Sequence, residues 1–327
     1  MQVRAPGRVN LIGDHTDYTG GLVFPMAIDR YTTITYKHTG DAVHLTSDDE
    51  PGVVNFGPHD AFDSTIEPRW GRYVAAVASL VTTPQPLHGN ITTTIPVGAG
   101  LSSSAALEIS CALAMGSTLG SRELAQMTQR AEQLATGVPT GIMDQLCIAS
   151  ARDGHGTLID CHTLEITHIP IPNEVDIVVQ FIAHRTLEGS EYATRVAECA
   201  AAESVIGPLR LADISQVDTI TDDIIRARAR HVVSENERVR QFTDALVRGQ
   251  YTAAGRLMVG SHQSLARDYA TSTPQMDAAV DAAVHTEGVF GARMTGGGFG
   301  GCIVALCTPE SSLPGWRVRP SGAAAHL

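Results

Sequence analysis

The segment from Pro96 to Glu108 constrains the fold of this chain more than any other. It reads Pro-Val-Gly-Ala-Gly-Leu-Ser-Ser-Ser-Ala-Ala-Leu-Glu, follows a β-branched run over 91–95 and leads into a helical pattern. Its glycines allow the backbone to approach a ligand closely, and a helix N-terminus presents unpaired N–H groups at the positive end of its dipole. Three serine hydroxyls add groups that bind phosphate or its metal. The segment therefore predicts a strand, loop and helix that bind an anion, most naturally a nucleotide phosphate.

Two observations limit this interpretation. Glycine-rich turns before helices are common and serines cap helices without binding anything, so a purely structural role is the alternative for this stretch. The segment is also not the P-loop of other nucleotide enzymes, because that motif requires a lysine after its last glycine. The only lysine of the chain, Lys37, is far from any glycine-rich turn. We therefore expect any phosphate to be bound by backbone, serine, arginine and metal.

A dense polar cluster lies near the N-terminus and alternates with aliphatic residues. Its polar members are Arg8, Asn10, Asp14, His15, Asp17 and Tyr18. We expect a strand and turn that present these side chains from a packed base. Carboxylates accept hydrogen bonds from sugar hydroxyls, and histidine can donate or accept, so the cluster suits hydroxyl recognition. A surface turn or a metal site built on His-x-Asp are the alternatives.

Further charged and aromatic residues stand at helical positions. Trp70 opens an apolar pattern at helical spacing, which is typical of a core residue. A second helix is predicted from Ser121 to Gly137, with Glu132 near its end as an exposed or metal-facing carboxylate. Asp144 begins an apolar helical stretch, where the helix N-terminus stabilises its charge. A charge among apolar neighbours needs a partner, which makes Asp144 a candidate functional group, with an N-cap aspartate as the alternative.

The second half of the chain alternates strand and helix patterns. Residues 157–159, 166–171 and 175–181 read as strands, and 222–248 as a helix with a solvated arginine-rich face. A second glycine-rich loop, 294–301, has five glycines in six residues and implies close backbone approach to a ligand or to the first loop. Since the chain has 327 residues, we expect two domains, the second beginning near residue 166.

Composition excludes several classes of function. The formal net charge of −12 argues against nucleic acid or an anionic membrane as the main partner. Six scattered cysteines form no C-x-x-C pair, so we expect reduced, buried thiols. No apolar run is long enough to cross a membrane, and the first six residues contain no signal-peptide core. We expect a cytoplasmic, monomeric protein whose partners are small molecules.

Several stretches together resemble the motifs of the GHMP small-molecule kinases, in family order. The resemblance runs from residue 4 to about 320, and residues 7–18 are most similar to the signature of the galactokinase family. The matching stretches are 7–18, 96–105, Gly141-Ile142-Met143-Asp144-Gln145, Ser190-Glu191-Tyr192 and 294–301.

The resemblance implies a two-domain α/β (α+β) fold with the active site in the cleft between the domains. The N-terminal domain would span 1–165 and bind ATP and sugar, completed by the final strand within 312–327. The C-terminal α+β domain would span 166–311.

The resemblance also implies a role for each matched residue. Asp144 would be the catalytic carboxylate near the anomeric hydroxyl, and Arg8 would stabilise both its charge and the moving phosphoryl group. The sugar hydroxyls would be held by Asp14, His15, Asp17, Tyr192 and the backbone of Gly141. The ATP phosphates would be cradled by Gly98, Ala99, Gly100, Leu101, Ser102 and Ser103. Ser104 would bind the nucleotide and, with Glu132, Mg²⁺. Trp70 would flank the adenine.

The implied reaction is transfer of a phosphoryl group from ATP to D-galactose with Mg²⁺, giving α-D-galactose 1-phosphate and ADP. One departure from the family pattern concerns the sugar: Asp14 stands where galactokinases usually carry glutamate. The shorter side chain leaves a kinase for another hexose, a pentose, a uronic acid or an amino sugar as an alternative. A non-catalytic sensor of sugar and ATP is a second alternative, which is disfavoured because the phosphate loop, Asp144 and Arg8 are intact.

Overall fold

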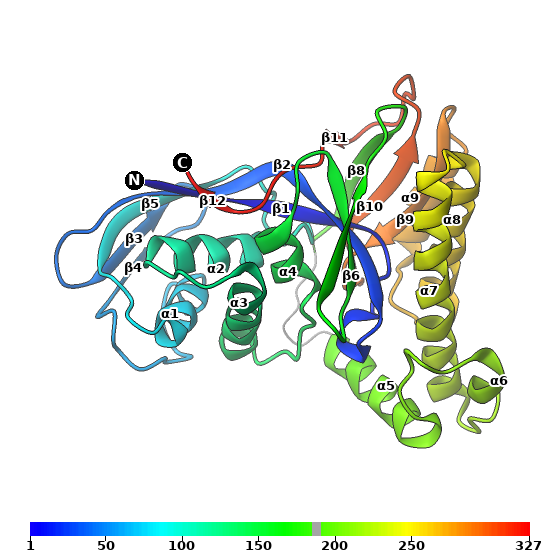
Figure 1. Ribbon diagram of the computed structural model, residues 1–327, viewed down its shortest axis with the longest axis horizontal. Coiled ribbons are helices and arrows are strands. Elements are labelled where there is room, and N and C mark those ends of the chain that lie inside the picture. Colours follow the sequence, from blue (N-terminus) through cyan, green and yellow to red (C-terminus); the bar gives the residue numbers. More distant parts are fainter. Residues whose placement is uncertain (185–190) are drawn as a thin grey trace.

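The computed structural model describes residues 1–184 and 191–327 and contains two antiparallel-rich β-sheets with helices packed on them (Figure 1). Ser190, part of one predicted motif, lies outside the described residues. The mixed α/β architecture agrees with the predicted fold class. Of the helices in the described ranges, none combines the length and apolar composition that crossing a bilayer requires.

The larger sheet has the strand order β12-β1-β2-β5-β3-β4, and β6 joins it by pairing with β2 and β7. Its strands are β1 (Gln2–Ile12), β2 (Leu22–Lys37), β3 (Val43–Ser47), β4 (Val53–Phe56), β5 (Leu87–Thr93), β6 (His155–Asp160), β7 (Glu165–Pro170) and β12 (Ala325–His326). Strand β2 runs without a break and pairs with β1 along both of its halves, across a register shift after Pro6. The β1–β2 ribbon is therefore the longest strand pairing of the sheet.

The smaller sheet has the order β11-β8-β10-β9, with all neighbours antiparallel. Its strands are β8 (Asp176–Ala183), β9 (Val289–Thr295), β10 (Gly301–Cys307) and β11 (Trp316–Val318). The change from the larger to the smaller sheet comes after β7 rather than before it, because β7 forms a hairpin with β6. The C-terminal segment is shared, since β11 pairs with β8 whereas β12 pairs with β1.

The helices of the described residues pack on the sheets or on one another. They are η1 (Asp17–Thr19), α1 (Gly71–Leu80), α2 (Ser103–Ala114), α3 (Ser121–Thr136), α4 (Met143–Ser150), α5 (Tyr192–Ile206), α6 (Ile214–Val217), α7 (Asp223–Val247), α8 (Tyr251–Arg267) and α9 (Pro274–Val284). Helices α1 to α4 gather beside the larger sheet, and α8 and α9 pack on the smaller one (Figure 1). As predicted, α3 ends at Gly137, whose left-handed φ of 70° closes the helix.

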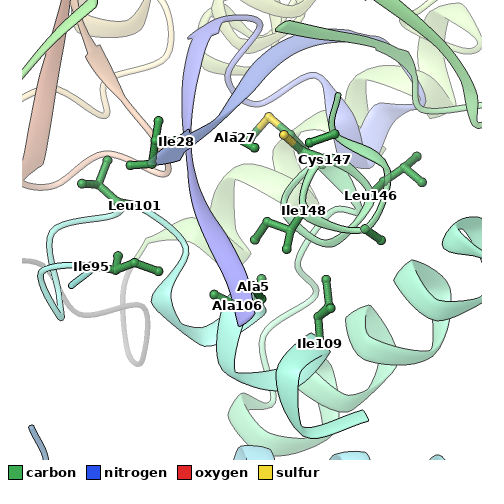
Figure 2. Packing of buried hydrophobic residues seen from close by; sticks show 14 of the residues in the cluster. Ala5, Ala27, Ile28, Ile95, Leu101, Ala106, Ile109, Leu146, Cys147 and Ile148 are labelled. Atoms are coloured by element: carbon green, nitrogen blue, oxygen red, sulfur yellow. The ribbon is translucent and has the colours of Figure 1, made fainter. Parts of the chain in front are cut away.

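Small side chains bring α2 and α4 close to the β1–β2 ribbon. Figure 2 shows Ala5 of β1, Ala106 and Ile109 of α2 and Ile148 of α4 meeting in a fully buried cluster. Alanine at two of these positions allows close approach of helix and strand, as interior packing requires. This packing holds the first turns of α2 and α4 near each other, as a hydrogen bond between Ser102 and Asp144 shows.

Candidate active site

A cavity of about 390 Å³ lies where α2 and α4 begin, and residues of β1, the turn after it, α5 and the second glycine loop also line it. Most of the predicted site residues lie on its wall. They are Arg8, Asp14, His15, Asp17, Trp70, Gly98, Gly100, Ser102, Ser103, Ser104, Glu132, Gly141, Asp144 and Tyr192. Segments more than a hundred residues apart in the sequence thus converge on one cavity.

Asp144 and Arg8 form an ion pair on the cavity wall. Asp144 stands in the first turn of α4, and Arg8 on β1 donates from Nε to its Oδ1 at 2.7 Å and from Nη2 to its Oδ2 at 2.6 Å. Although burial opposes the charge of Arg8, the Asp144 carboxylate raises the pKa of the guanidinium. The side chain of Arg8 is 3% exposed and that of Asp144 22%, so the carboxylate is the partner that faces the cavity. Such a paired fork fixes the carboxylate in one orientation.

The phosphate loop is joined to this pair. The third side-chain hydrogen bond of Arg8 runs from Nη1 to the carbonyl of Gly100 at 2.7 Å, and its backbone N–H donates to the carbonyl of Leu101. Ser102 has a left-handed φ of 61° and donates from Oγ to Asp144 at 2.5 Å, instead of capping α2. Since the N-cap side chain makes no bond to the helix, the first N–H groups of α2 are left for an anion.

Two loop residues predicted to take part do not line the cavity with their side chains. Ala99 and Leu101 are fully buried in the core, and Figure 2 shows Leu101 among its apolar members. Neither residue is among those that line the cavity. The alternation of apolar and glycine residues therefore anchors the loop from beneath while Gly98 and Gly100, both with positive φ, form its exposed side.

Ser104 and Glu132 lie together on the cavity wall. Ser104 Oγ donates to Glu132 Oε1 at 2.8 Å, and Gln145 Nε2 donates to Glu132 Oε2 at 2.9 Å and to Glu108 at 3.2 Å. Burial, and then the charge of Asp144, raises the pKa of Glu132. Glu108 is fully buried, and burial followed by Glu132 raises its pKa well above the ordinary value. A cation here would relieve a crowded set of carboxylates, and hard oxygen donors are what Mg²⁺ prefers.

Asp17 and Gly141 meet at one end of the cavity. A Cβ atom on Gly141 would lie 1.8 Å from Asp17 Oδ2, so only glycine fits there. Burial, followed by the charge of Asp144, raises the pKa of Asp17 to about 7, although backbone N–H groups of Tyr18 and Met143 oppose the shift. Near pH 7 a carboxyl group with this pKa is partly protonated, so it can donate a hydrogen bond to a hydroxyl as well as accept one.

Aromatic rings surround His15 at the same end. His15 adopts a left-handed φ of 64°, and its Nδ1 lies 2.9 Å from the hydroxyl of Tyr18. The ring centroids of Tyr269 and Tyr192 lie 4.7 Å and 5.5 Å from that of His15. Tyr192, the first residue of α5, is buried and contributes to the cavity wall. Polar groups on a rigid aromatic base suit a small ligand rich in hydroxyls.

The end near Trp70 is built differently. Trp70 is half-buried, its indole N–H donates to the carbonyl of Pro51 at 3.0 Å, and Tyr73 and Leu107 line the cavity beside it. The apolar and aromatic surfaces there can cover the face of a planar base.

The charge around the cavity is strongly negative. Among the described residues that line it, six carry carboxylates and two are arginines, Arg8 and Arg69. Since Arg8 is already paired with Asp144, a polyphosphate entering the cavity needs an additional cation.

Several residues at the site were not identified from the sequence. Glu108 and Gln145 support Glu132, and Arg293 contacts Asp14. The signal for Arg293 was present, since a lone arginine in the apolar strand before the second glycine loop needs a buried partner. Glu108 lies one helical turn after Ser104, which places both on one face of α2.

Three family models match the chain. They are "Galactokinase galactose-binding signature" over residues 1–38, "GHMP kinases N terminal domain" over 72–152 and "GHMP kinases C terminal" over 242–314. A crystal structure of a mevalonate kinase shares the fold, with a TM-score of 0.70 and 20% identity over 98% of this chain and 99% of that one. The fold and the order of its segments are those of the GHMP kinases.

Closer relatives narrow the family. Galactokinase from Chloroflexus aggregans is 41% identical over 94% of this chain and 84% of the relative, and human galactokinase is 39% identical over 94% and 83%. The crystal structure of Lactococcus lactis galactokinase complexed with galactose matches with a TM-score of 0.92 and 30% identity, covering 100% of this chain and 95% of that one. The chain belongs to the galactokinase family. This membership confirms the predicted family and the predicted class of enzyme, a kinase that uses ATP.

Proposed function

We propose that this chain transfers the γ-phosphoryl group of ATP to the anomeric hydroxyl of D-galactose, giving α-D-galactose 1-phosphate and ADP. The observation that carries the proposal is the pairing of Asp144 with Arg8 and Ser102 at the meeting point of the phosphate loop and the hydroxyl-recognising cluster. The galactokinase structure with bound galactose supports the sugar, and family membership supports ATP as the donor.

In this proposal Asp144 accepts the proton of the sugar O1 hydroxyl as O1 attacks the γ-phosphorus. The O1–P bond forms while the bond from phosphorus to the β,γ-bridging oxygen breaks, and ADP departs with that oxygen. Phosphoryl transfer depends on in-line positioning and neutralisation of charge more than on covalent chemistry. Arg8 balances the charge of Asp144 and holds the carboxylate still, because its fork occupies one side of both oxygens.

Ser104 and Glu132 are the residues that would hold Mg²⁺. Their oxygens lie 2.8 Å apart on the cavity wall and are hard donors, which fits the ion. Bound there, Mg²⁺ would neutralise phosphate charge in a cavity that otherwise carries an excess of carboxylates. The backbone N–H groups at the start of α2 and the loop around Gly98 and Gly100 would bind the phosphates, and Trp70 would cover the base.

The first test measures ADP release with ATP, Mg²⁺ and a panel of sugars, followed by identification of the phosphorylated product. We expect galactose to be the preferred substrate, with phosphate on O1. Turnover of a different sugar would retain the mechanism and reassign the pocket around Asp14. Absence of turnover with every sugar, in folded protein that binds ATP, would contradict the proposal and favour a sensor.

A further inference from the structure

Strand β9 carries one arginine in a wholly buried setting. Arg293 is 0% exposed, and a buried charge is costly unless it is paired and hydrogen-bonded. Its Nη2 lies 2.5 Å from Asp14 Oδ2 and 4.0 Å from Glu235 Oε1, and its Nε donates to Ser261 Oγ at 3.1 Å. The guanidinium therefore joins the first motif of the chain to α7 and α8.

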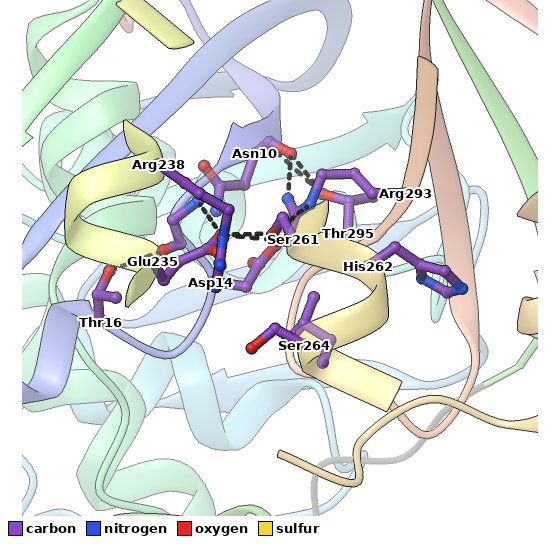
Figure 3. Close-up of polar contacts among 12 residues, drawn as sticks. Asn10, Asp14, Thr16, Glu235, Arg238, Ser261, His262, Ser264, Arg293 and Thr295 are labelled. Carbon is purple, nitrogen blue, oxygen red and sulfur yellow. Dashed lines mark hydrogen bonds and ion pairs between the residues drawn. The ribbon is translucent and has the colours of Figure 1, made fainter. Parts of the chain in front are cut away.

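Asp14 is held from a second side. Its Oδ1 accepts a 3.1 Å hydrogen bond from the backbone N–H of Gly296, directly after β9. Both carboxylate oxygens of Asp14 thus contact groups of the smaller sheet, although Asp14 itself follows β1 of the larger one. Figure 3 shows Asp14, Glu235 and Arg293 facing one another between these elements.

Arg293 is fixed in turn by Glu235. Glu235 Oε1 accepts from the backbone of Gly13 at 3.0 Å and from Ser261 at 2.5 Å, and its Oε2 accepts from Arg238 at 2.6 Å. Burial alone would raise the pKa of Glu235, but Arg238, His231 and Arg293 lower it to about 2. The charges alternate in the order Asp14, Arg293, Glu235, Arg238. The oxygen of Glu235 that faces Arg293 is held by Gly13 and Ser261, whereas Arg238 contacts the other oxygen.

The orientation of Asp14 has a chemical consequence at the cavity. Each carboxylate oxygen has about two acceptor positions. Oδ1 of Asp14 uses one of them for the N–H of Gly296, and Oδ2 faces the guanidinium of Arg293 in an ion pair. Asp14 is only 2% exposed, and it lines the cavity beside His15 and Asp17. A sugar hydroxyl therefore meets an acceptor whose direction is already set, and a hydroxyl of the wrong epimer leaves that acceptor unpaired.

We propose that Arg293 is a positioning residue that sets sugar specificity by fixing the carboxylate of Asp14 toward the sugar ring. This inference rests on the proposed function and deepens it. Arg293 lies behind Asp14 and is absent from the cavity wall, so it acts through Asp14 and not by touching the sugar.

The experiment compares Arg293→Gln, Arg293→Lys, Asp14→Asn and the double variant Asp14→Asn/Arg293→Gln. For each, kcat and KM are measured with galactose and with its epimers glucose and talose, together with KM for ATP. We expect Arg293→Gln to raise KM for galactose about tenfold and to reduce the preference for galactose over the epimers by a similar factor, while kcat and KM for ATP change less than about twofold. The double variant should have the same KM and the same sugar preference as Asp14→Asn, because both changes remove the same interaction.

Arg238→Gln is the matched control. It removes a cation from the same chain of ion pairs, but Arg238 contacts Glu235 and Ser234 and not Asp14. We expect it to lower the melting temperature and to leave the ratio of galactose to epimer turnover unchanged. If Arg293→Gln does not fold, Arg293→Lys decides, since it retains the charge but loses the fork and should still weaken the preference.

Two outcomes would overturn the inference: folded Arg293 variants with wild-type preference, or effects of Asp14→Asn and Arg293→Gln that add fully. A failure of the proposed function itself is distinguishable, because it appears as absence of turnover in the wild-type protein. Calorimetric titration of the same variants with galactose would then test the inference on binding alone. An unchanged affinity in the Arg293 variants would overturn it.

Discussion

The two ends of the cavity are built differently, and we expect them to bind different ligands. The phosphate end, around residues 98–104, offers backbone N–H groups of one contiguous segment, with Glu132 added from α3. The polyol end, around Asp17, offers side chains from β1, its following turn, α4 and α5, with Arg293 of the other sheet behind them. An anion can be bound by many similar donors, whereas a neutral polyol requires individual acceptors in fixed places. The second end therefore depends on the whole fold.

Asp144 belongs to both ends, so its loss is expected to have the largest effect. Replacing it by asparagine keeps the shape but removes the charge and the proton acceptor. We expect kcat to fall by about 10²- to 10⁴-fold, measured by coupled ADP release, while ATP affinity changes little. Near-normal turnover of folded Asp144→Asn would contradict its assignment.

Gly141→Ala tests the polyol end alone. The new Cβ would overlap the carboxylate of Asp17, so this side chain must turn away from the cavity. We expect KM for galactose to rise by at least about tenfold with KM for ATP unchanged. Gly137→Ala is the control, since a Cβ there meets nothing within 4 Å, and it should affect stability through its positive φ but not sugar binding. Equal effects of both variants on galactose KM would remove the distinction between the two ends.

Ser104→Ala tests the phosphate end. It removes one of the two oxygens expected to hold Mg²⁺ and one hydrogen bond to Glu132. We expect the Mg²⁺ concentration for half-maximal activity to rise about tenfold, with KM for galactose unchanged. Ser110→Ala, in the same helix but bonded to the carbonyl of Ala106, is the matched control. An unaltered Mg²⁺ requirement in Ser104→Ala would place the ion elsewhere.

The smallest expected effect is a pH dependence of KM for galactose, which we attribute to Asp17. Its pKa of about 7 means that the carboxyl is neutral below this value and becomes a full acceptor above it. We expect KM for galactose to fall several-fold as pH rises from about 6 to about 8, and Asp17→Asn to abolish this slope.

The same shift predicts the sign of a stability effect. Because the folded protein holds this proton to higher pH than the unfolded chain, the free energy of unfolding should decrease as pH rises from about 4 to about 7. Asp17→Asn should flatten that part of the curve in thermal denaturation. An identical pH dependence in wild type and variant would show that Asp17 does not hold the proton.

The sequence by itself determined the glycine-rich loop and the start of the helix that follows it. Glycine and serine spacing in residues 96–104 predicts a loop at a helix N-terminus because these residues act on the chain next to them. The same local logic placed Asp144 in the first turn of a helix and ended α3 at Gly137.

Only the tertiary structure decided how the polyol end is built. A lone charge in an apolar strand shows that Arg293 needs a partner, but not that the partner is Asp14, 279 positions earlier in the chain. Nor does the sequence pattern reveal that Gly141 is glycine because Asp17 lies against it, or that Ser102 bonds Asp144 instead of capping α2. The physical reason is that local geometry depends on neighbouring residues, whereas the pairing of buried charges depends on how the two sheets pack.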